Sequence, residues 1–301
     1  MDTFKLTTGI SPTYKITKVN FEEKTLKEEP YVKKQVNKVS YYAVCPECDN
    51  PIQIVGLQKN TIESGSNPYG RHNKGDVTDL ALYSEIDYLE CPFSNPSWTK
   101  KPGKRSSKSP LANKMLLNMR NYFDCAIKLL QEMTGLKISR NLAKQLLENY
   151  LLDEGWLYRQ ATLNNIPWIL GESSPAIPLF GQYIYKNSAL FHSIQDKCAD
   201  IVLEPAGFSE DLVQIRNKPG QFIKLEFIFC NHQQNIKGES MQEMIDFWVF
   251  RKGNTESDGT IFRKTIPIEA NDFIDLIQEV GSEHRDEKLL AVAKELTENY
   301  M

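Results

Sequence analysis

The chain has 301 residues, of which 41% are hydrophobic and 25% are charged, and its formal net charge is −3 at pH 7. This composition is typical of a folded globular protein and excludes a fibrous or largely disordered chain, and the length allows two domains that fold without disulfides. No stretch approaches the ~18 apolar residues of a membrane span and the N-terminus lacks a signal-peptide apolar region, so we expect a cytoplasmic protein without membrane contact.

The first part of the chain is predicted to be rich in β-strands. Residues 14–19 alternate in polarity, residues 32–44 combine valines and tyrosines with lysines, and residues 52–55 continue the extended pattern. The composition of residues 58–76 indicates a surface loop. A short helix is predicted over residues 77–88, with three apolar side chains facing inward: Leu80, Ile86 and Leu89.

A proline- and serine-rich stretch follows and is the best candidate for a domain boundary. It carries five cations and no acidic residue, namely Lys100, Lys101, Lys104, Arg105 and Lys108. Such a segment is either a solvated linker or an arm that contacts phosphates. We therefore predict a β-rich domain over residues 1–95, a basic linker over residues 96–110 and a second domain over residues 111–301.

The second domain is predicted to begin with a pair of helices. Ser109 and Pro110 form a typical helix start, the apolar spacing then continues to residue 134, and Ser139 is positioned to cap a second helix that ends at Leu152. The two helices also allow a helix-turn-helix DNA-binding motif, but their continuous apolar stripes favour packing of both helices in the core. Residues 179–199 are a weaker helical candidate.

Three β-rich runs near the C-terminus predict an antiparallel meander. They span residues 222–230, 244–250 and 261–268, and polar loops with glycines separate them. Helices are predicted over residues 271–280 and 283–300. The expected fold class is therefore α+β: a zinc-stabilised β-rich domain, a helical pair, and an antiparallel sheet backed by helices.

The sequence Cys45-Pro46-Glu47-Cys48 lies between two strand-like segments. Two thiolates at this spacing on a tight turn can occupy adjacent corners of a tetrahedron around zinc. A thioredoxin-like redox pair instead precedes a helix, whereas Asp49-Asn50-Pro51 favours a turn. The pattern resembles the knuckle of a zinc ribbon over residues 40–57.

A zinc ribbon normally has a second such pair, which this chain lacks. Two other residues can complete a set of three cysteines and one histidine, namely Cys91 and His72. Cys91 precedes a proline, as Cys45 does, and His72 follows the flexible Gly70. The alternatives are a buried apolar role for Cys91 and an exposed or phosphate-binding role for His72. Four protein ligands would make the zinc structural, because they leave no position for an activated water.

Catalytic candidates are weaker. His232 ends a strongly predicted strand, and Glu226 and Asp246 belong to the same predicted sheet, so these three residues are the candidates for an acid–base site. The common phosphate-loop, dinucleotide and nucleophile-elbow motifs are absent from the sequence, which disfavours those classes of enzyme.

The charge distribution favours nucleic-acid binding. Residues 1–150 contain 22 Lys and Arg against 16 Asp and Glu, whereas residues 151–301 contain 14 against 23. We predict a zinc-stabilised nucleic-acid-binding protein with an acidic C-terminal domain that contacts a protein partner. Aromatic residues among the cations can stack on bases: Tyr41, Tyr42, Tyr69 and Trp98. The alternatives are a nuclease or other hydrolase, and a regulatory module with structural zinc.

Overall fold

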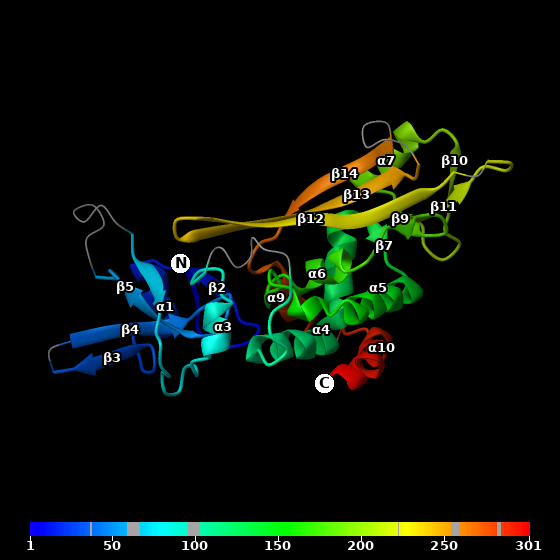
Figure 1. The fold of residues 1–301 in the computed structure, drawn as a ribbon. Helices are drawn as coiled ribbons and strands as arrows, with labels where there is room; N and C mark the ends of the chain where they lie inside the picture. Colours follow the sequence, from blue (N-terminus) through cyan, green and yellow to red (C-terminus); the bar gives the residue numbers. More distant parts are fainter. Residues whose placement is uncertain (37, 59–66, 96–102, 222, 254–258, 282–283) are drawn as a thin grey trace.

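The computed structural model describes residues 1–36, 38–58, 67–95, 103–221, 223–253, 259–281 and 284–301. Within these residues the chain has the predicted α+β architecture: antiparallel sheets and helices alternate along the chain, and its N-terminal part is rich in strands (Figure 1). Among the described helices, none has both the length and the apolarity that a bilayer crossing requires.

The N-terminal sheet has the order β2-β1-β4-β5-β6, and β3 pairs with β4. All of its described pairings are antiparallel. Its strands are β1 Thr3–Lys5, β2 Thr13–Lys15, β3 Val32–Gln35, β4 Lys38–Val44, β5 Pro51–Val55 and β6 Tyr69–His72.

Two predictions in this region are wrong. The strand expected over residues 14–19 ends at Lys15, and helix α1 (Lys18–Thr25) follows because the Thr17 side chain accepts a hydrogen bond from the Asn20 amide at 3.1 Å and caps the helix. The helix expected over residues 77–88 shrinks to α3 (Glu85–Leu89). In α3 the buried residue is Asp87, whereas two of the apolar side chains expected inside are exposed: Ile86 and Leu89.

The predicted helical pair is confirmed. Helix α4 spans Pro110–Thr134, capped by Ser109, and helix α5 spans Arg140–Leu152, capped by Ser139. Gly135 ends α4 with φ of 76°, a left-handed conformation that glycine adopts at little cost. Met115 and Met119 on the predicted apolar stripe are fully buried, so these helices form the middle of the core.

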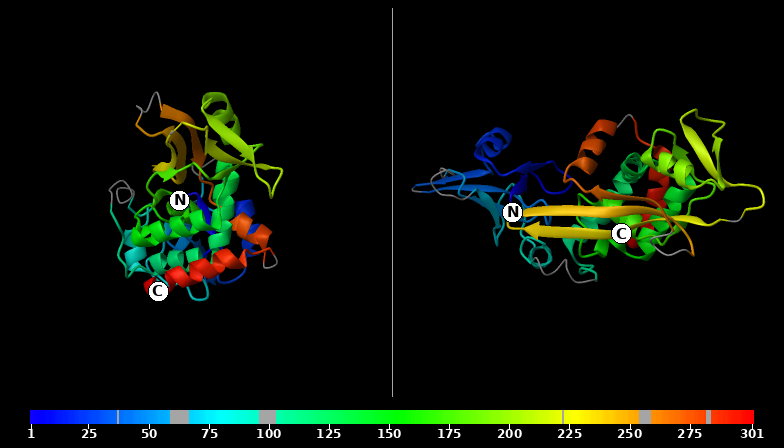
Figure 2. Two further views of the ribbon diagram at one scale, coloured as in Figure 1. Left: turned by 90° about the vertical axis from the view of Figure 1, so that its right-hand side faces the viewer. Right: turned by 90° about the horizontal axis from the view of Figure 1, so that it is seen from above.

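The predicted meander is also confirmed, with longer strands than expected. Strands β12 (Leu225–Lys237), β13 (Ser240–Arg251) and β14 (Thr260–Pro267) pair in the order β14-β13-β12, and the short strand β8 (Ile177–Pro178) adds at the edge. The polar residues expected to form a loop instead extend the β12–β13 hairpin. Figures 1 and 2 show this hairpin reaching the N-terminus of the chain, where Asp2 donates its amide to the Glu239 carbonyl at 2.8 Å.

A third sheet was not predicted. It has the order β10-β11-β9-β7. Part of it occupies the weak helical candidate over residues 179–199, where helix α7 covers only Ala189–Lys197. Its strands are β7 Leu136–Lys137, β9 Tyr183–Tyr185, β10 Ile201–Pro205 and β11 Leu212–Asn217. The remaining α-helices are α6 Ile166–Glu172, α9 Asp272–Val280 and α10 Glu287–Thr297, and two 3₁₀ segments span Gly155–Leu157 and Glu298–Tyr300.

Most of the described buried apolar side chains form one continuous cluster, whose members range along the sequence from Met1 to Ala293. Helix α4 lies at its centre and packs against α6, α9 and α10. The N-terminal sheet joins this cluster through Phe4 on β1 and Ile52 on β5, and α1 joins it through Phe21. The division at residues 95 and 110 stays a prediction, because residues 96–102 lie outside the described part of the chain.

Candidate metal centre and outer sheet face

The four predicted metal ligands come together from three places in the N-terminal region. Cys45 and Cys48 lie in the turn between β4 and β5, His72 ends β6, and Cys91 follows α3. The turn is closed by hydrogen bonds from the Cys45 amide to the Asn50 carbonyl at 2.8 Å and from the Asp49 amide to the Cys45 carbonyl at 3.2 Å. The left-handed conformation of Asp49, with φ of 59°, reverses the chain at this point.

The geometry of the cluster fits a tetrahedral metal ion. One ligand atom from each of the four residues lies within 4.8 Å of all the others. The Sγ atoms of Cys45 and Cys91 are 3.9 Å apart, and the Cys48 Sγ is 3.3 Å from the His72 Nε2. Tetrahedral zinc with Zn–S bonds of about 2.3 Å requires S···S distances of about 3.8 Å and S···N distances of about 3.5 Å. The chain therefore holds four suitable donors at metal-binding distances.

Burial makes the thiol cluster dependent on a positive partner. The three sulfurs are almost completely buried, and burial raises the pKa of Cys48 and Cys91 well above its usual value. Burial acts in the same direction on Cys45, but hydrogen bonds from the other two thiols hold the pKa of Cys45 well below its usual value. A divalent cation at the centre would stabilise all three thiolates at once, since metal ligation replaces the lost hydration.

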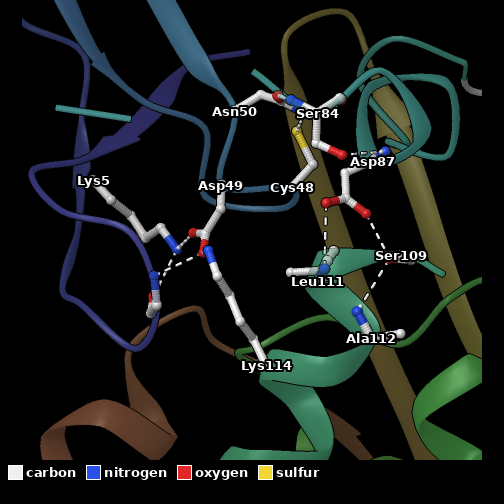
Figure 3. Close-up of polar contacts among 11 residues, drawn as sticks. Lys5, Cys48, Asp49, Asn50, Ser84, Asp87, Ser109, Leu111, Ala112 and Lys114 are labelled. Carbon is white, nitrogen blue, oxygen red and sulfur yellow. Dashed lines mark hydrogen bonds and ion pairs between the residues drawn. The ribbon is translucent and has the colours of Figure 1, made fainter. Parts of the chain in front are cut away.

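Neighbouring polar groups fix the ligands in place. The Asn50 side chain donates to the Cys48 sulfur at 3.3 Å, and it also bridges to the Ser84 backbone, accepting from the Ser84 amide at 2.6 Å (Figure 3). The His72 ring lies edge-on to Tyr88, with ring centroids 5.2 Å apart. These contacts orient the ligands in the way that outer partners do at metal sites.

Two buried aspartates connect this cluster to helix α4, and Figure 3 shows both. Asp49 accepts hydrogen bonds from Lys5 at 2.6 Å and from Lys114 on α4 at 2.7 Å. Asp87 accepts from the Ser109 hydroxyl at 2.5 Å and from the Leu111 amide at 3.2 Å. The carboxylate of Asp87 thus lies at the positive N-terminal end of α4, where it is favoured. The sequence prediction missed both residues.

The arrangement has the chemistry of a structural site. Four protein ligands complete a tetrahedron and leave no position for a reactive water. The cluster joins the β4–β5 turn, the end of β6 and the segment after α3, so a bound ion would crosslink residues that are up to 46 positions apart. Such a crosslink adds stability to a region built from short strands.

A second feature is the outer face of strands β3 to β6. Strand pairing and alternation place eleven side chains on this face, which we call the outer face: Lys33, Gln35, Lys38, Ser40, Tyr42, Val44, Pro51, Gln53, Val55, Tyr69 and Arg71. Three of them are buried, namely Ser40, Val44 and Pro51. Arg71 donates to the Gln53 side chain at 3.2 Å, and the Lys33 ammonium lies 5.9 Å from the Tyr42 ring centroid. The opposite face carries His72 and the core residues Ile52 and Ile54.

The described strands β3 to β6 contain no aspartate or glutamate. The three cations of the outer face therefore have no acidic neighbour on these strands. Tyr42 and Tyr69 are half-buried and do not pack against the core cluster, whereas Tyr41 does, lying edge-on to Phe21 at 5.8 Å. Alternation along β4 thus separates two aromatic residues that the sequence analysis had grouped together.

The predicted basic arm is divided in the structure. Lys100, Lys101 and also Trp98 lie outside the described residues. Lys104 forms an ion pair with Glu154 at 2.9 Å, and Lys108 is exposed. Arg105 is buried and donates to the Ala161 carbonyl at 2.7 Å and to the Arg159 carbonyl at 3.2 Å. Of the described cations in this stretch, Arg105 is therefore in the interior, where it would not contact the phosphates of a nucleic acid.

The three catalytic candidates do not gather at one site. Glu226 pairs with Lys252 at 2.9 Å and lies six residues from His232, a span of about 20 Å along a strand. Asp246 accepts from Arg263 at 2.8 Å and from Thr265 at 2.6 Å. Both carboxylates thus already serve as partners for neighbouring groups in the sheet.

His232 instead lies between two glutamates that the sequence analysis did not connect to it. Its Nε2 is 2.5 Å from a Glu243 oxygen and its Nδ1 is 3.6 Å from a Glu172 oxygen. Burial acts to lower the pKa of His232, but the hydrogen bond and charge of Glu243 raise it above its usual value. Because the His232 side chain is only 1% exposed, a dissolved substrate does not reach it in this conformation.

Comparison of the chain with protein-family models, with curated proteins and with solved structures found no match. Functional inference for this chain therefore rests on the chemistry of its own residues. The features that carry such chemistry most clearly are the four-ligand cluster and the outer face beside it, whose described strands contain no aspartate or glutamate.

Proposed function

We propose that this chain is a nucleic-acid-binding protein whose N-terminal sheet is held in place by a structural zinc ion. The main support for this proposal is the outer face of β3 to β6, which presents Lys33, Lys38 and Arg71 on strands that contain no carboxylate. Cations in such a setting attract a polyanion, and their contacts with phosphates release condensed counterions.

Zinc is the ion that the donor set favours. Three thiolates and one imidazole in a tetrahedral arrangement are soft and borderline ligands, which zinc prefers, whereas magnesium and calcium require oxygen ligands. The ion would act through stability alone: by joining His72 at the end of β6 to the β4–β5 turn, it would keep the cations of the outer face on one rigid surface.

In this proposal the C-terminal part of the chain contacts a protein partner. This part is acidic, since residues 151–301 carry 23 acidic side chains against 14 cations. A hydrolase function has less support. Its best candidate is His232, whose buried side chain lies between Glu172 and Glu243. This contact stabilises the fold and does not expose the imidazole to a substrate.

The test is binding of labelled oligonucleotides by fluorescence anisotropy over a series of salt concentrations. The variant Lys38→Gln/Arg71→Gln removes two cations from the outer face, so the slope of log K against log salt should become shallower by about 1.5. The matched control is Lys288→Gln/Lys294→Gln, which removes two exposed cations from α10 and should leave the slope unchanged.

Two results would contradict the proposal. One is a parent protein that binds no oligonucleotide even at low salt. The other is an equal loss of slope in the outer-face variant and the α10 control, because net charge would then account for binding without a defined surface.

A further inference from the structure

The outer face has the features of a surface that stacks bases. Tyr42 on β4 and Tyr69 on β6 lie on the outer face and are half-buried, with Gln53 on the intervening strand β5. Base–aromatic stacking is favourable for every base, because each base has a π-face. The Lys33 ammonium beside the Tyr42 ring adds a cation where a stacked nucleotide would carry its phosphate.

The shape of this surface favours one form of nucleic acid. Four adjacent strands, separated by about 4.8 Å each, make a surface about 14 Å across, and the major groove of DNA is about 12 Å wide. A sheet face of this width lies against a duplex without entering its groove. In a duplex the bases are also stacked on each other, so their faces are not available to Tyr42 and Tyr69.

Polar side chains between the two tyrosines complete the surface. The amide of Gln53, which is half-buried on β5, both donates and accepts hydrogen bonds. The hydrogen bond from Arg71 to Gln53 holds the guanidinium on the face, next to Tyr69 on the same strand. Exposed base edges and phosphates of one strand therefore both find partners here.

We propose that the outer face binds single-stranded nucleic acid, with bases stacked on Tyr42 and Tyr69 and the backbone neutralised by Lys33, Lys38 and Arg71. This inference rests on the proposed nucleic-acid binding and specifies its substrate class. Single strands of DNA and RNA share this chemistry, so binding of either supports the inference.

The experiment measures binding of this 301-residue chain to labelled single strands of about 15 nucleotides, one a deoxythymidine and one a uridine homopolymer, and to a duplex of the same length. Anisotropy at low salt should show tighter binding of a single strand than of the duplex. Tyr42→Ala and Tyr69→Ala should each weaken single-strand binding by at least about fivefold, which is the lower end for loss of one stacked base.

Two control variants identify the cause of any loss. Tyr42→Phe keeps the ring and should retain the affinity of the parent. Phe208→Ala removes an aromatic side chain that is 68% exposed but lies far from the outer face in sequence, next to β11, and should also bind as the parent does. Circular dichroism and metal content establish that each variant is folded.

The outcomes separate this inference from the proposed function. Binding of single strands that is unchanged in both Tyr→Ala variants, or binding of the duplex at least as tightly as either single strand, would overturn the inference and leave nucleic-acid binding in place. Absence of binding to all three probes at low salt would overturn both.

Discussion

The N-terminal and C-terminal sheets are both antiparallel but depend on different interactions. In the C-terminal sheet, long strands carry a cluster of aromatic rings: Phe247 lies 5.9 Å from Phe227, 5.0 Å from Phe229 and 6.2 Å from Phe262, measured between ring centroids. The strands of the N-terminal sheet have three to seven residues, and polar interactions take a larger share there.

The polar interactions of the N-terminal sheet are concentrated at its junction with helix α4. They comprise the four-ligand cluster, the buried pair of Lys5 and Asp49, and the contact of Asp87 with Ser109. An apolar core is stabilised by the apolar surface area that it removes from water, whereas a ligand cluster is stabilised by an ion that can be removed. The two sheets should therefore respond to different perturbations.

Loss of the metal should have the largest effect and should be confined to the N-terminal sheet. Cys48→Ser leaves an incomplete ligand shell, and a structural zinc site of this kind contributes on the order of 10 kcal/mol. We expect loss of bound zinc, and hydrogen exchange should show faster exchange in β4 to β6 and unchanged protection in β12 and β13.

The matched control is Cys125→Ser, which removes a buried thiol from α4 without touching the cluster. It should keep the full zinc content by elemental analysis. Equal zinc in the Cys48→Ser variant and the parent would show that the cluster does not hold the ion.

The converse perturbation is Phe247→Ala in the C-terminal sheet. Its side chain is fully buried among three other rings, so its removal should lower the free energy of unfolding by about 3–5 kcal/mol. Zinc content should not change. Chemical denaturation with and without a chelator checks this: the chelator should act on this variant as it acts on the parent, and loss of zinc on mutation would contradict the separation of the two sheets.

Ser109 links the two regions, because its hydroxyl both caps α4 and donates to Asp87. Ser109→Ala removes the cap and leaves a buried carboxylate with one partner fewer, which should cost about 1–3 kcal/mol. Ser139→Ala is the control, since it caps α5 and should cost only about 1 kcal/mol. Denaturation midpoints that do not differ between the two variants would show that the Asp87 contact adds nothing.

The sequence predicted best those elements whose signals are local. The limits of α4 and α5 follow from Ser109, Gly135 and Ser139, because capping is a property of a few adjacent residues. The Cys45 and Cys48 pair was found for the same reason. His72 and Cys91 were found by residue type, and their position beside the pair was confirmed by the fold.

Features that depend on distant contacts were missed or misplaced. The polar ends of β12 and β13 resemble a loop in sequence, and they are extended because Glu239 meets the N-terminus and Gln234 and Glu243 contact each other across the hairpin. The sequence gives no signal that Asp87 is buried, and the N-terminus of α4 is what makes its burial favourable. Burial of these polar groups is set by tertiary partners that no local pattern reveals.

The smallest predicted effect concerns the hairpin that joins the two regions, through the pH dependence of His232. Despite burial, which acts to lower it, contact with Glu243 raises the pKa of His232 in the folded state. The contribution of this group to stability is therefore fully present below the usual histidine pKa of about 6.5 and is lost as pH rises through the folded-state pKa.

The free energy of unfolding should differ between the parent and His232→Gln by more at pH 6 than at pH 8.5, as measured by urea denaturation. A difference for His232→Gln that is constant with pH would mean that the ring binds Glu243 as a neutral donor, and the hairpin would then be held without a charged contact at this point.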